Sequence, residues 1–231
     1  MIKILAFLTM LIDHIGIIFF PDFPIFCIIG RLSFPLFAYG ISVGYKYTHN
    51  YFRYAVRLLF LAIISQIPYY YLFELRNLNV CFTLLAGLVL IKIYDVIKVA
   101  WLRWTAILGV LFLTEILNCS YGLYGALTIL IFHIVSDENI LVLAQAVLTF
   151  ISVIVFRINP IQLIAALSPI LIMFFKNINF KINRFIQYSF YPGHMLILLL
   201  IKYSFFKGRG YNYSSSLHRA SMEHGGSYRK V

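Results

Sequence analysis

Apolar segments long enough to cross a membrane follow one another along almost the whole chain, and this pattern restricts the fold more than any other feature. Of the 231 residues, 62% are hydrophobic and 12% are charged, whereas soluble domains have about 45–50% apolar and about 25% charged residues. A helical span needs about 17–25 residues. We therefore predict an all-α, polytopic transmembrane helical bundle with about nine spans, within a range of about eight to ten.

The expected spans make one domain, residues 1–206, followed by a short tail. Residues 207–231 are polar and rich in turn formers, which predicts disorder. The first span lacks a small-residue cleavage site, so we expect it to be retained and not removed as a signal peptide. The spans are expected near residues 2–20, 25–45, 55–73, 79–94, 104–118, 121–136, 140–156, 161–175 and 185–206.

Connections that carry basic residues alternate along the chain with connections that carry few or none. The second connection carries Lys46, Arg53 and Arg57, whereas the first carries no base. The positive-inside bias then places the N-terminus in the cytoplasm. With nine spans the basic tail falls outside, which leaves three alternatives: a re-entrant late segment, an even number of spans, or a tail that does not set topology. These loops account for the net charge of +11, so we expect membrane lipids as partners and no nucleic acid.

Three ionisable residues lie within the first two expected spans: Asp13, His14 and Arg31. Each costs about 2.5–3.5 kcal/mol in a bilayer core, and such groups usually face a bundle interior and have a function. His14 precedes the end of its span, and Arg31 follows the start of the next, by about 9 Å each at 1.5 Å per residue. We therefore expect one polar layer, with His194 of the last span as a further candidate.

Asp13 and His14 are sequence neighbours, and neighbours on a helix point about 100° apart. We expect them to have different partners: Asp13 pairs with Arg31 while His14 faces a cavity. The alternative is that Asp13 and Arg31 form a purely structural ion pair. Polar residues at similar depth are candidates for substrate or cofactor contact; they are Ser33, Gln66, Asn79, Thr83, Tyr121 and Tyr124. For Gln66, Asn79 and Thr83 the alternative is ordinary interhelical hydrogen bonding.

A histidine within a membrane suits two tasks, which are general-base catalysis of group transfer and proton relay. Cys27, Cys81 and Cys119 have no metal-ligand spacing, so we expect no metal and interpret them as small apolar filler.

Several motifs together resemble one family. They are DHIG at 13–16, GRLSFP at 30–35, ISQIP at 64–68 and YPGH at 191–194. Because these motifs occur together, in this order and in these spans, the chain is similar to the TraX family over about residues 1–203. That family is associated with acetylation of the N-terminal amine of F-pilin in conjugation. The resemblance also extends to the wider group of polytopic membrane acyltransferases, which use an intramembrane histidine.

The resemblance implies that His14 is the catalytic histidine and that Asp13 orients it or neutralises Arg31. It implies that Arg31 contacts the thioester or the phosphates of the donor, with His194 as a second catalytic candidate. The expected co-substrate is acetyl-CoA or another acyl-CoA. The acceptor would be an amine or hydroxyl of a pilin-like peptide, a glycan or a lipid-linked surface component, and the location the bacterial plasma membrane.

Two other classes of function stay open. A transporter of a small solute or of protons could use Asp13, His14 and Arg31 as a relay, although the internal repeat common in transporters is not visible. An assembly or scaffold protein would use its buried polar pairs for packing alone.

Overall fold

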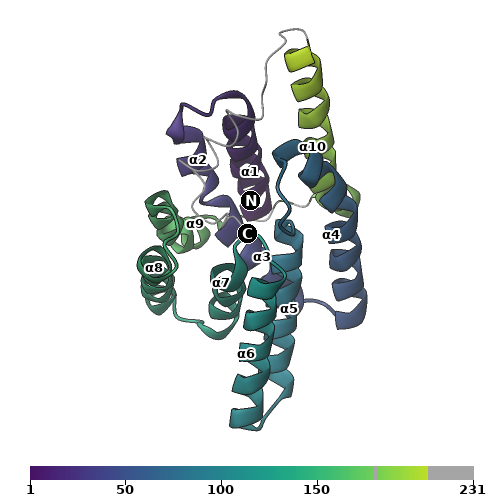
Figure 1. Ribbon diagram of the computed structural model, residues 1–231. Coiled ribbons are helices and arrows are strands. Elements are labelled where there is room, and N and C mark those ends of the chain that lie inside the picture. The colour runs from purple at the N-terminus through teal and green to yellow at the C-terminus, as the bar shows by residue number, and fades with distance from the viewer. Residues whose placement is uncertain (179, 181, 208–231) are drawn as a thin grey trace.

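A computed structural model describes residues 1–178, 180 and 182–207, and that part of the chain is helical, without a strand (Figure 1). Every expected span coincides with a helical segment. The predicted tail lies outside the described residues apart from Lys207, the last residue of α10. The elements are α1 (Ile2–Phe19), α2 (Pro24–Gly30), α3 (Ser33–Lys46), α4 (Tyr51–Phe73), α5 (Val80–Val96), α6 (Ala100–Ile116), α7 (Gly122–Ile134), α8 (Glu138–Val155), the 3₁₀ helix η1 (Pro160–Leu167), α9 (Ser168–Phe175) and α10 (Arg184–Lys207).

Four of these segments are long and apolar enough to cross a membrane, namely Ile2–Phe19, Pro24–Lys46, Tyr51–Phe73 and Glu138–Val155. Two shorter apolar helical segments cover Gly122–Ile134 and Pro160–Phe175. A bilayer admits helices because their backbone groups are satisfied within the segment. The protein is therefore an all-helical membrane protein, as the composition predicts.

Two of the expected spans are interrupted helices. The second expected span consists of α2 and α3, which meet at Arg31 and Leu32. Pro35 has no N–H to offer the carbonyl of Arg31 four residues earlier, so the helical ladder is interrupted at that point. The eighth expected span begins as the 3₁₀ helix η1 and continues as α9 after Leu167.

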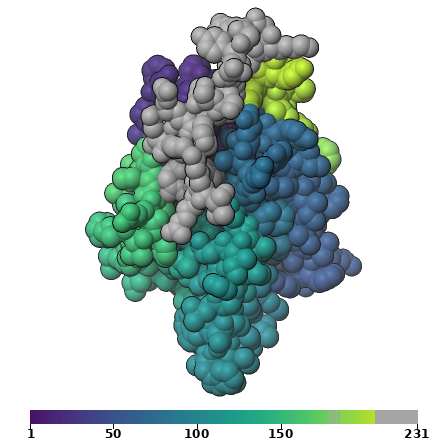
Figure 2. Space-filling view, viewed as in Figure 1, coloured from purple at the N-terminus to yellow at the C-terminus, as the bar shows by residue number. Residues whose placement is uncertain are grey.

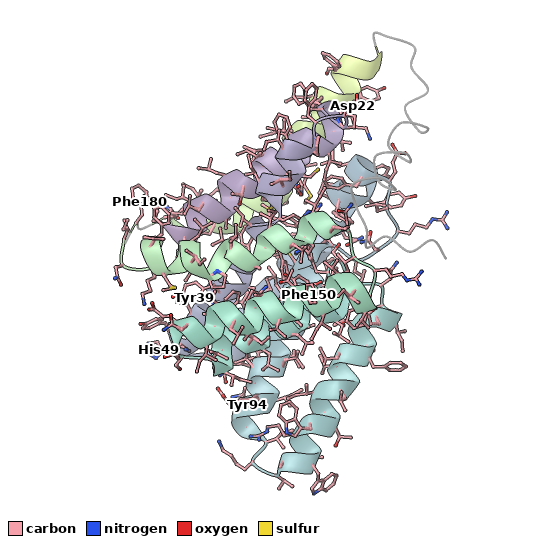
Figure 3. All side chains as sticks on the ribbon, turned by 90° about the vertical axis from the view of Figure 1, so that its left-hand side faces the viewer. Asp22, Tyr39, His49, Tyr94, Phe150 and Phe180 are labelled. Atoms are coloured by element: carbon pink, nitrogen blue, oxygen red, sulfur yellow. The ribbon has the colours of Figure 1, made fainter. Side chains whose placement is uncertain are left out.

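Contacts between the connections define two ends of the bundle. At the N-terminal end, the amino group of Met1 donates to the carbonyl of Ile178 at 2.8 Å. At the opposite end, the backbone N–H of Ser120 donates to the carbonyl of Leu78 at 2.8 Å. Figure 3 places Asp22 at one end and His49 and Phe180 at the other. The helices therefore alternate in direction, as a chain that crosses repeatedly requires.

Helix α10 packs against α4 and also contacts α1, whereas α1 packs mainly against α2 and α3. Helices α3, α5 and α7 pack together, and α8 packs against η1. The α5–α6 hairpin extends beyond the rest in both views (Figures 1 and 2). Helix α8 has its apolar side chains outside, such as Leu143 and Phe150 at 65% and 57% exposure. Beyond its first turn, the polar side chains of α8 are buried, and they are Gln145, Thr149 and Ser152. This distribution is the reverse of a soluble helix and fits a helix that faces lipid.

Candidate active site

His14 and His194 contact each other across the interface of α1 and α10. His14 Nδ1 lies 2.8 Å from His194 Nε2, and the two rings stack with centroids 5.0 Å apart and 17° between their planes. The second ring nitrogen of His194, Nδ1, donates to the carbonyl of Phe190 at 2.8 Å, one helical turn earlier in α10. The sequence names both histidines as candidates, and the fold brings them together.

Aromatic side chains enclose this pair. Phe190 stacks on His194 with centroids 5.1 Å apart, and Phe73 of α4 meets the His14 ring in a T-shaped contact with centroids 4.9 Å apart. His194 is 6% exposed, and His14 is half-buried. Within the part of the chain that the structure describes, His14 Nε2 has no hydrogen-bond partner. The pair therefore has one available nitrogen, and it belongs to His14.

Asp13 faces a different element from His14, as helix geometry predicts. Its carboxylate lies against α2, so close to Gly30 that a Cβ there would be 2.0 Å from Asp13 Oδ1. This oxygen is buried and accepts no hydrogen bond from the described residues. No ion pair within 4.0 Å joins Asp13 and Arg31 among residues 1–178, 180 and 182–207, although Arg31 lies near enough for its positive charge to act on the Asp13 carboxylate.

Arg31 begins a buried chain of hydrogen bonds that runs away from α1. Its Nη1 donates to Gln162 Oε1 in η1 at 3.5 Å, and Gln162 Nε2 donates to the hydroxyl of Tyr124 in α7 at 3.4 Å. Gln145 Nε2 in α8 donates to the same hydroxyl at 3.1 Å. We refer to these four residues with Thr149 as the Arg31 chain.

The direction of the last bonds in the Arg31 chain follows from a backbone carbonyl. The Thr149 hydroxyl donates to the carbonyl of Gln145 at 2.7 Å, so the Tyr124 hydroxyl, 3.3 Å away, donates to Thr149. Tyr124 thus accepts from two amides and donates once. Gln145 Oε1 remains without a partner among the described residues. Turning the amide over would only move the unpartnered position to its nitrogen.

Gln66 and Asn79 form a structural network at the end of the bundle opposite Met1. Gln66 Oε1 accepts from both the backbone N–H and the side-chain amide of Asn79 at 2.9 Å, and Gln66 Nε2 donates to the carbonyl of Asn77 at 3.0 Å. Asn79 caps α5, where its Oδ1 accepts from the N–H of Cys81 at 2.9 Å. Both side chains are engaged in capping.

The other predicted contact residues also join helices. The Ser33 hydroxyl donates to the carbonyl of Ala6 at 3.1 Å, and the Thr83 hydroxyl donates to the carbonyl of Ser120. The Tyr121 ring stacks on Phe34 with centroids 4.2 Å apart. Interhelical bonding, the alternative considered from the sequence for Gln66, Asn79 and Thr83, accounts for these three side chains, and it accounts for Ser33 as well.

Sequence reasoning missed Gln145, Thr149 and Gln162, all buried at 0–1% exposure. The signal was present in α8, because Gln145, Thr149 and Ser152 follow the i, i+4, i+7 spacing of one helix face within an apolar segment. Phe190 was missed because its backbone carbonyl, and not its side chain, bonds to His194. No residue pattern encodes that contact.

Cysteine and metal chemistry find little support in the described residues. The three cysteines are free and buried. In the α6–α7 connection, burial together with the Glu115 carboxylate raises the pKa of the Cys119 thiol to about 11. A thiol needs to ionise to act as a nucleophile, so Cys119 is poorly suited to that role. Residues 1–178, 180 and 182–207 contain no group of three His, Cys, Asp or Glu side chains arranged to hold a metal ion.

Comparison with known proteins gives one family and one curated relative. The profile of the family described as TraX protein matches residues 1–202. A probable fimbrial assembly protein FimC, serogroup H1, of Dichelobacter nodosus is 27% identical over 146 residues. That match covers 56% of this chain and 59% of FimC, so it spans less than two thirds of the relative. No solved structure matches the chain significantly.

Proposed function

This chain belongs to the TraX protein family, and on that premise we propose that it is a membrane acyltransferase. It transfers an acetyl or other acyl group from acyl-CoA to an amine or hydroxyl of a surface component. The observation that carries the proposal is the histidine pair, in which His14 Nε2 has no hydrogen-bond partner among the described residues while its other nitrogen is engaged at 2.8 Å. An available neutral nitrogen within a membrane bundle suits a general base.

The reaction needs a base because the acceptor must lose a proton as it attacks. A histidine nitrogen takes the proton of the acceptor N–H or O–H, and the lone pair of that acceptor attacks the thioester carbonyl. The tetrahedral intermediate expels the CoA thiolate, which recovers a proton from the histidine. His14 is the primary candidate for this base and His194 the second.

The arrangement in the membrane follows from the connections. We propose that all nine helical segments cross a bacterial plasma membrane and that the N-terminus is cytoplasmic. Basic residues gather at the N-terminal end, at Lys46, Arg53, Lys98 and Arg103 among others. They satisfy the positive-inside bias and attract the polyanionic CoA from the same side.

The acceptor proposed is a pilin-like peptide amine. Two independent similarities support this choice: the association of the family with pilin acetylation, and the name of the FimC relative, a probable fimbrial assembly protein. A glycan or a lipid-linked surface component is the other acceptor class, because hydroxyls undergo the same base-assisted acylation.

A transfer assay tests this proposal. Purified protein is incubated with acetyl-CoA labelled in the acetyl group and with membrane extract, and label in peptide, glycan and lipid is counted. We expect transfer by the wild type and a loss of about 10²–10⁴-fold in His14→Gln, with unchanged thermal unfolding. Absence of transfer by the wild type to any macromolecule or lipid contradicts the enzyme hypothesis, and transfer that survives His14→Gln contradicts the choice of base.

A second candidate function, transport, is favoured by one specific observation. Two interrupted helical segments, α2–α3 and η1–α9, meet where Arg31 donates to Gln162 at 3.5 Å, and transporters bind their substrates at such discontinuous helices. Proteoliposomes loaded with a pH-sensitive dye discriminate the two. Proton flux in the absence of acyl-CoA that Gln162→Leu and His14→Gln both abolish would favour transport through the Asp13, His14 and Arg31 relay.

A further inference from the structure

We infer that the two histidines have different roles: His14 Nε2 takes the proton of the acceptor, and His194 is a positioning residue that fixes the tautomer of His14. The catalytic half of this inference rests on the proposed function. The tautomeric half rests on geometry alone and can be measured without an activity.

The argument starts from the carbonyl of Phe190, which can only accept a hydrogen bond. His194 Nδ1 lies 2.8 Å from this oxygen and therefore carries a hydrogen. A neutral imidazole has one N–H and one lone pair, so His194 Nε2 is the acceptor. His14 Nδ1, 2.8 Å from His194 Nε2, must then be the donor. In the state with both rings neutral, the only remaining lone pair is on His14 Nε2.

His194 is unsuited to be the base in this arrangement. Both of its nitrogens are engaged, one with Phe190 and one with His14, and its side chain is 6% exposed. To accept a proton from a substrate, His194 would have to give up one of these bonds. His14 can accept a proton at Nε2 and keep its bond to His194.

Packing fixes the positions of the groups that form the two hydrogen bonds, from His14 to His194 and from His194 to the Phe190 carbonyl. The Phe190 carbonyl lies on the same helix as His194 and one turn before it, so no movement of a neighbouring helix alters their separation. The Phe190 ring stacks on His194, and Phe7 of α1 stacks on Phe190 with centroids 4.4 Å apart. Phe73 meets the His14 ring edge to face from α4. Three helices thus fix two rings.

The proton step balances within this pair. The acceptor N–H or O–H transfers its proton to His14 Nε2 while its lone pair forms a bond to the thioester carbonyl carbon. The imidazolium formed on His14 donates through Nδ1–H to His194 Nε2, which spreads the new charge toward the Phe190 carbonyl. When the carbon–sulfur bond breaks, the proton on His14 Nε2 passes to the CoA sulfur. His194 thus has the role of the orienting third group in a nucleophile–base–orienter arrangement.

Nitrogen NMR tests the tautomeric half. The full chain is labelled with ¹⁵N-histidine, and His14→Gln and His194→Gln identify the two relevant signals among the six histidines of the sequence. We expect both rings to show a protonated Nδ1 and an unprotonated Nε2 near neutral pH. A protonated Nε2 on His14 in the wild type overturns the inference, whether or not the protein transfers acetyl groups.

Kinetics test the catalytic half with a matched pair of variants, His194→Leu and His194→Gln. The two side chains are similar in size, but only the amide can accept from His14 Nδ1–H and donate to the Phe190 carbonyl. We expect His194→Leu to lower kcat about 10–100-fold, as for other orienting partners of functional histidines, with the KM for acetyl-CoA nearly unchanged. His194→Gln should recover most of that loss, and Gly193→Ala, which meets no atom within 4 Å, is the control on the same helix.

Each outcome decides a separate point. Equal kcat in His194→Leu and His194→Gln means that His194 only packs, and it overturns the positioning role. Activity that survives His14→Gln but not His194→Gln reverses the two roles. If the wild type transfers no acetyl group, the proposed function fails, and the NMR result still decides the tautomer.

Discussion

The histidine pair and the Arg31 chain are both polar clusters inside an apolar bundle, yet they differ in how their hydrogen bonds are used. The histidine pair has two internal bonds and an available nitrogen on His14. In the Arg31 chain the Tyr124 hydroxyl alone has three polar neighbours, Gln145, Gln162 and Thr149. A cluster whose members satisfy one another stabilises a fold, whereas a group with spare capacity can meet a substrate. On this comparison the histidine pair is the cluster suited to proton transfer and the Tyr124 hydroxyl is structural, although Gln145 Oε1 in the Arg31 chain also lacks a partner among the described residues.

Helix α1 separates the two clusters, and its close contact with α2 keeps them apart. Gly16 and Gly30 allow this approach, because a Cβ at Gly16 would lie 2.1 Å from Phe26 Cβ. Small residues at helix interfaces let backbones approach closely in membranes. Asp13 lies in this contact, and His14 lies on a different face of α1, against α10.

Substitution at the α1–α2 contact has the largest expected effect. Gly30→Ala places a methyl group 2.0 Å from Asp13 Oδ1 and 2.3 Å from its Cγ, so α1 and α2 must separate or Asp13 must move. We expect a loss of about 3 kcal/mol in the free energy of unfolding, at the upper end for overpacking. Reversible unfolding in mixed micelles measures it, with Gly40→Ala as the matched control, since nothing lies within 4 Å of a Cβ there. Equal stability of the two variants would show that the contact between α1 and α2 is looser than the structure has it.

The second-largest effect is expected from removing one hydroxyl from the Arg31 chain. Tyr124→Phe takes away the acceptor of two amide donors and the donor to Thr149. Buried groups left unsatisfied cost about 1–3 kcal/mol, so we expect a loss of about 2 kcal/mol with kcat within about threefold of the wild type. Unfolding and the acetyl transfer assay are measured on the same preparation. A tenfold rise in the KM for acetyl-CoA at unchanged stability would instead place Tyr124 in the substrate site and erase the distinction between the clusters.

The Arg31 chain also contains a side chain whose hydrogen-bonding atoms are not all paired. Gln145 Oε1 is buried without a partner among the described residues, so an apolar side chain of similar size removes an unsatisfied atom together with one donor. Replacing imperfectly satisfied buried groups by apolar ones is often nearly neutral. We expect Gln145→Leu to change the free energy of unfolding by less than about 1 kcal/mol. A loss above about 3 kcal/mol would indicate that Oε1 binds a ligand or an ordered water in the folded protein.

The sequence predicts the helical segments well and the clusters only in part. Spans can be located because a bilayer demands uninterrupted apolar length, and the divergence of Asp13 and His14 follows from helix geometry. Depth counting, however, places residues along the membrane normal and says nothing about which side of a helix they occupy. Arg31 was therefore assigned to the layer of His14 and expected to pair with Asp13, whereas its guanidinium bonds Gln162, 131 residues away. The contact of His14 with His194 depends on the packing of the first helix against the last, which no local pattern contains.

The smallest expected effect lies beside the histidine pair, and it tests whether the Gly193 side of α10 is as open as the structure shows. A Cβ at Gly193 would meet no atom within 4 Å, although the next residue is one of the two histidines. Gly193→Ala reduces the freedom of the unfolded chain without a clash, so we expect a gain of about 0.5 kcal/mol in the free energy of unfolding and unchanged kcat. The same substitution at Gly30 is expected to be strongly destabilising, so the two alanines measure the difference between the regions directly. Two results would contradict this expectation: destabilisation by Gly193→Ala, or a changed tautomer of His14 in the ¹⁵N spectrum of that variant. Either would mean that α10 is more tightly constrained around His194 than the structure implies. The hydrogen bond from His194 Nδ1 to the Phe190 carbonyl would then be the contact to test for that constraint.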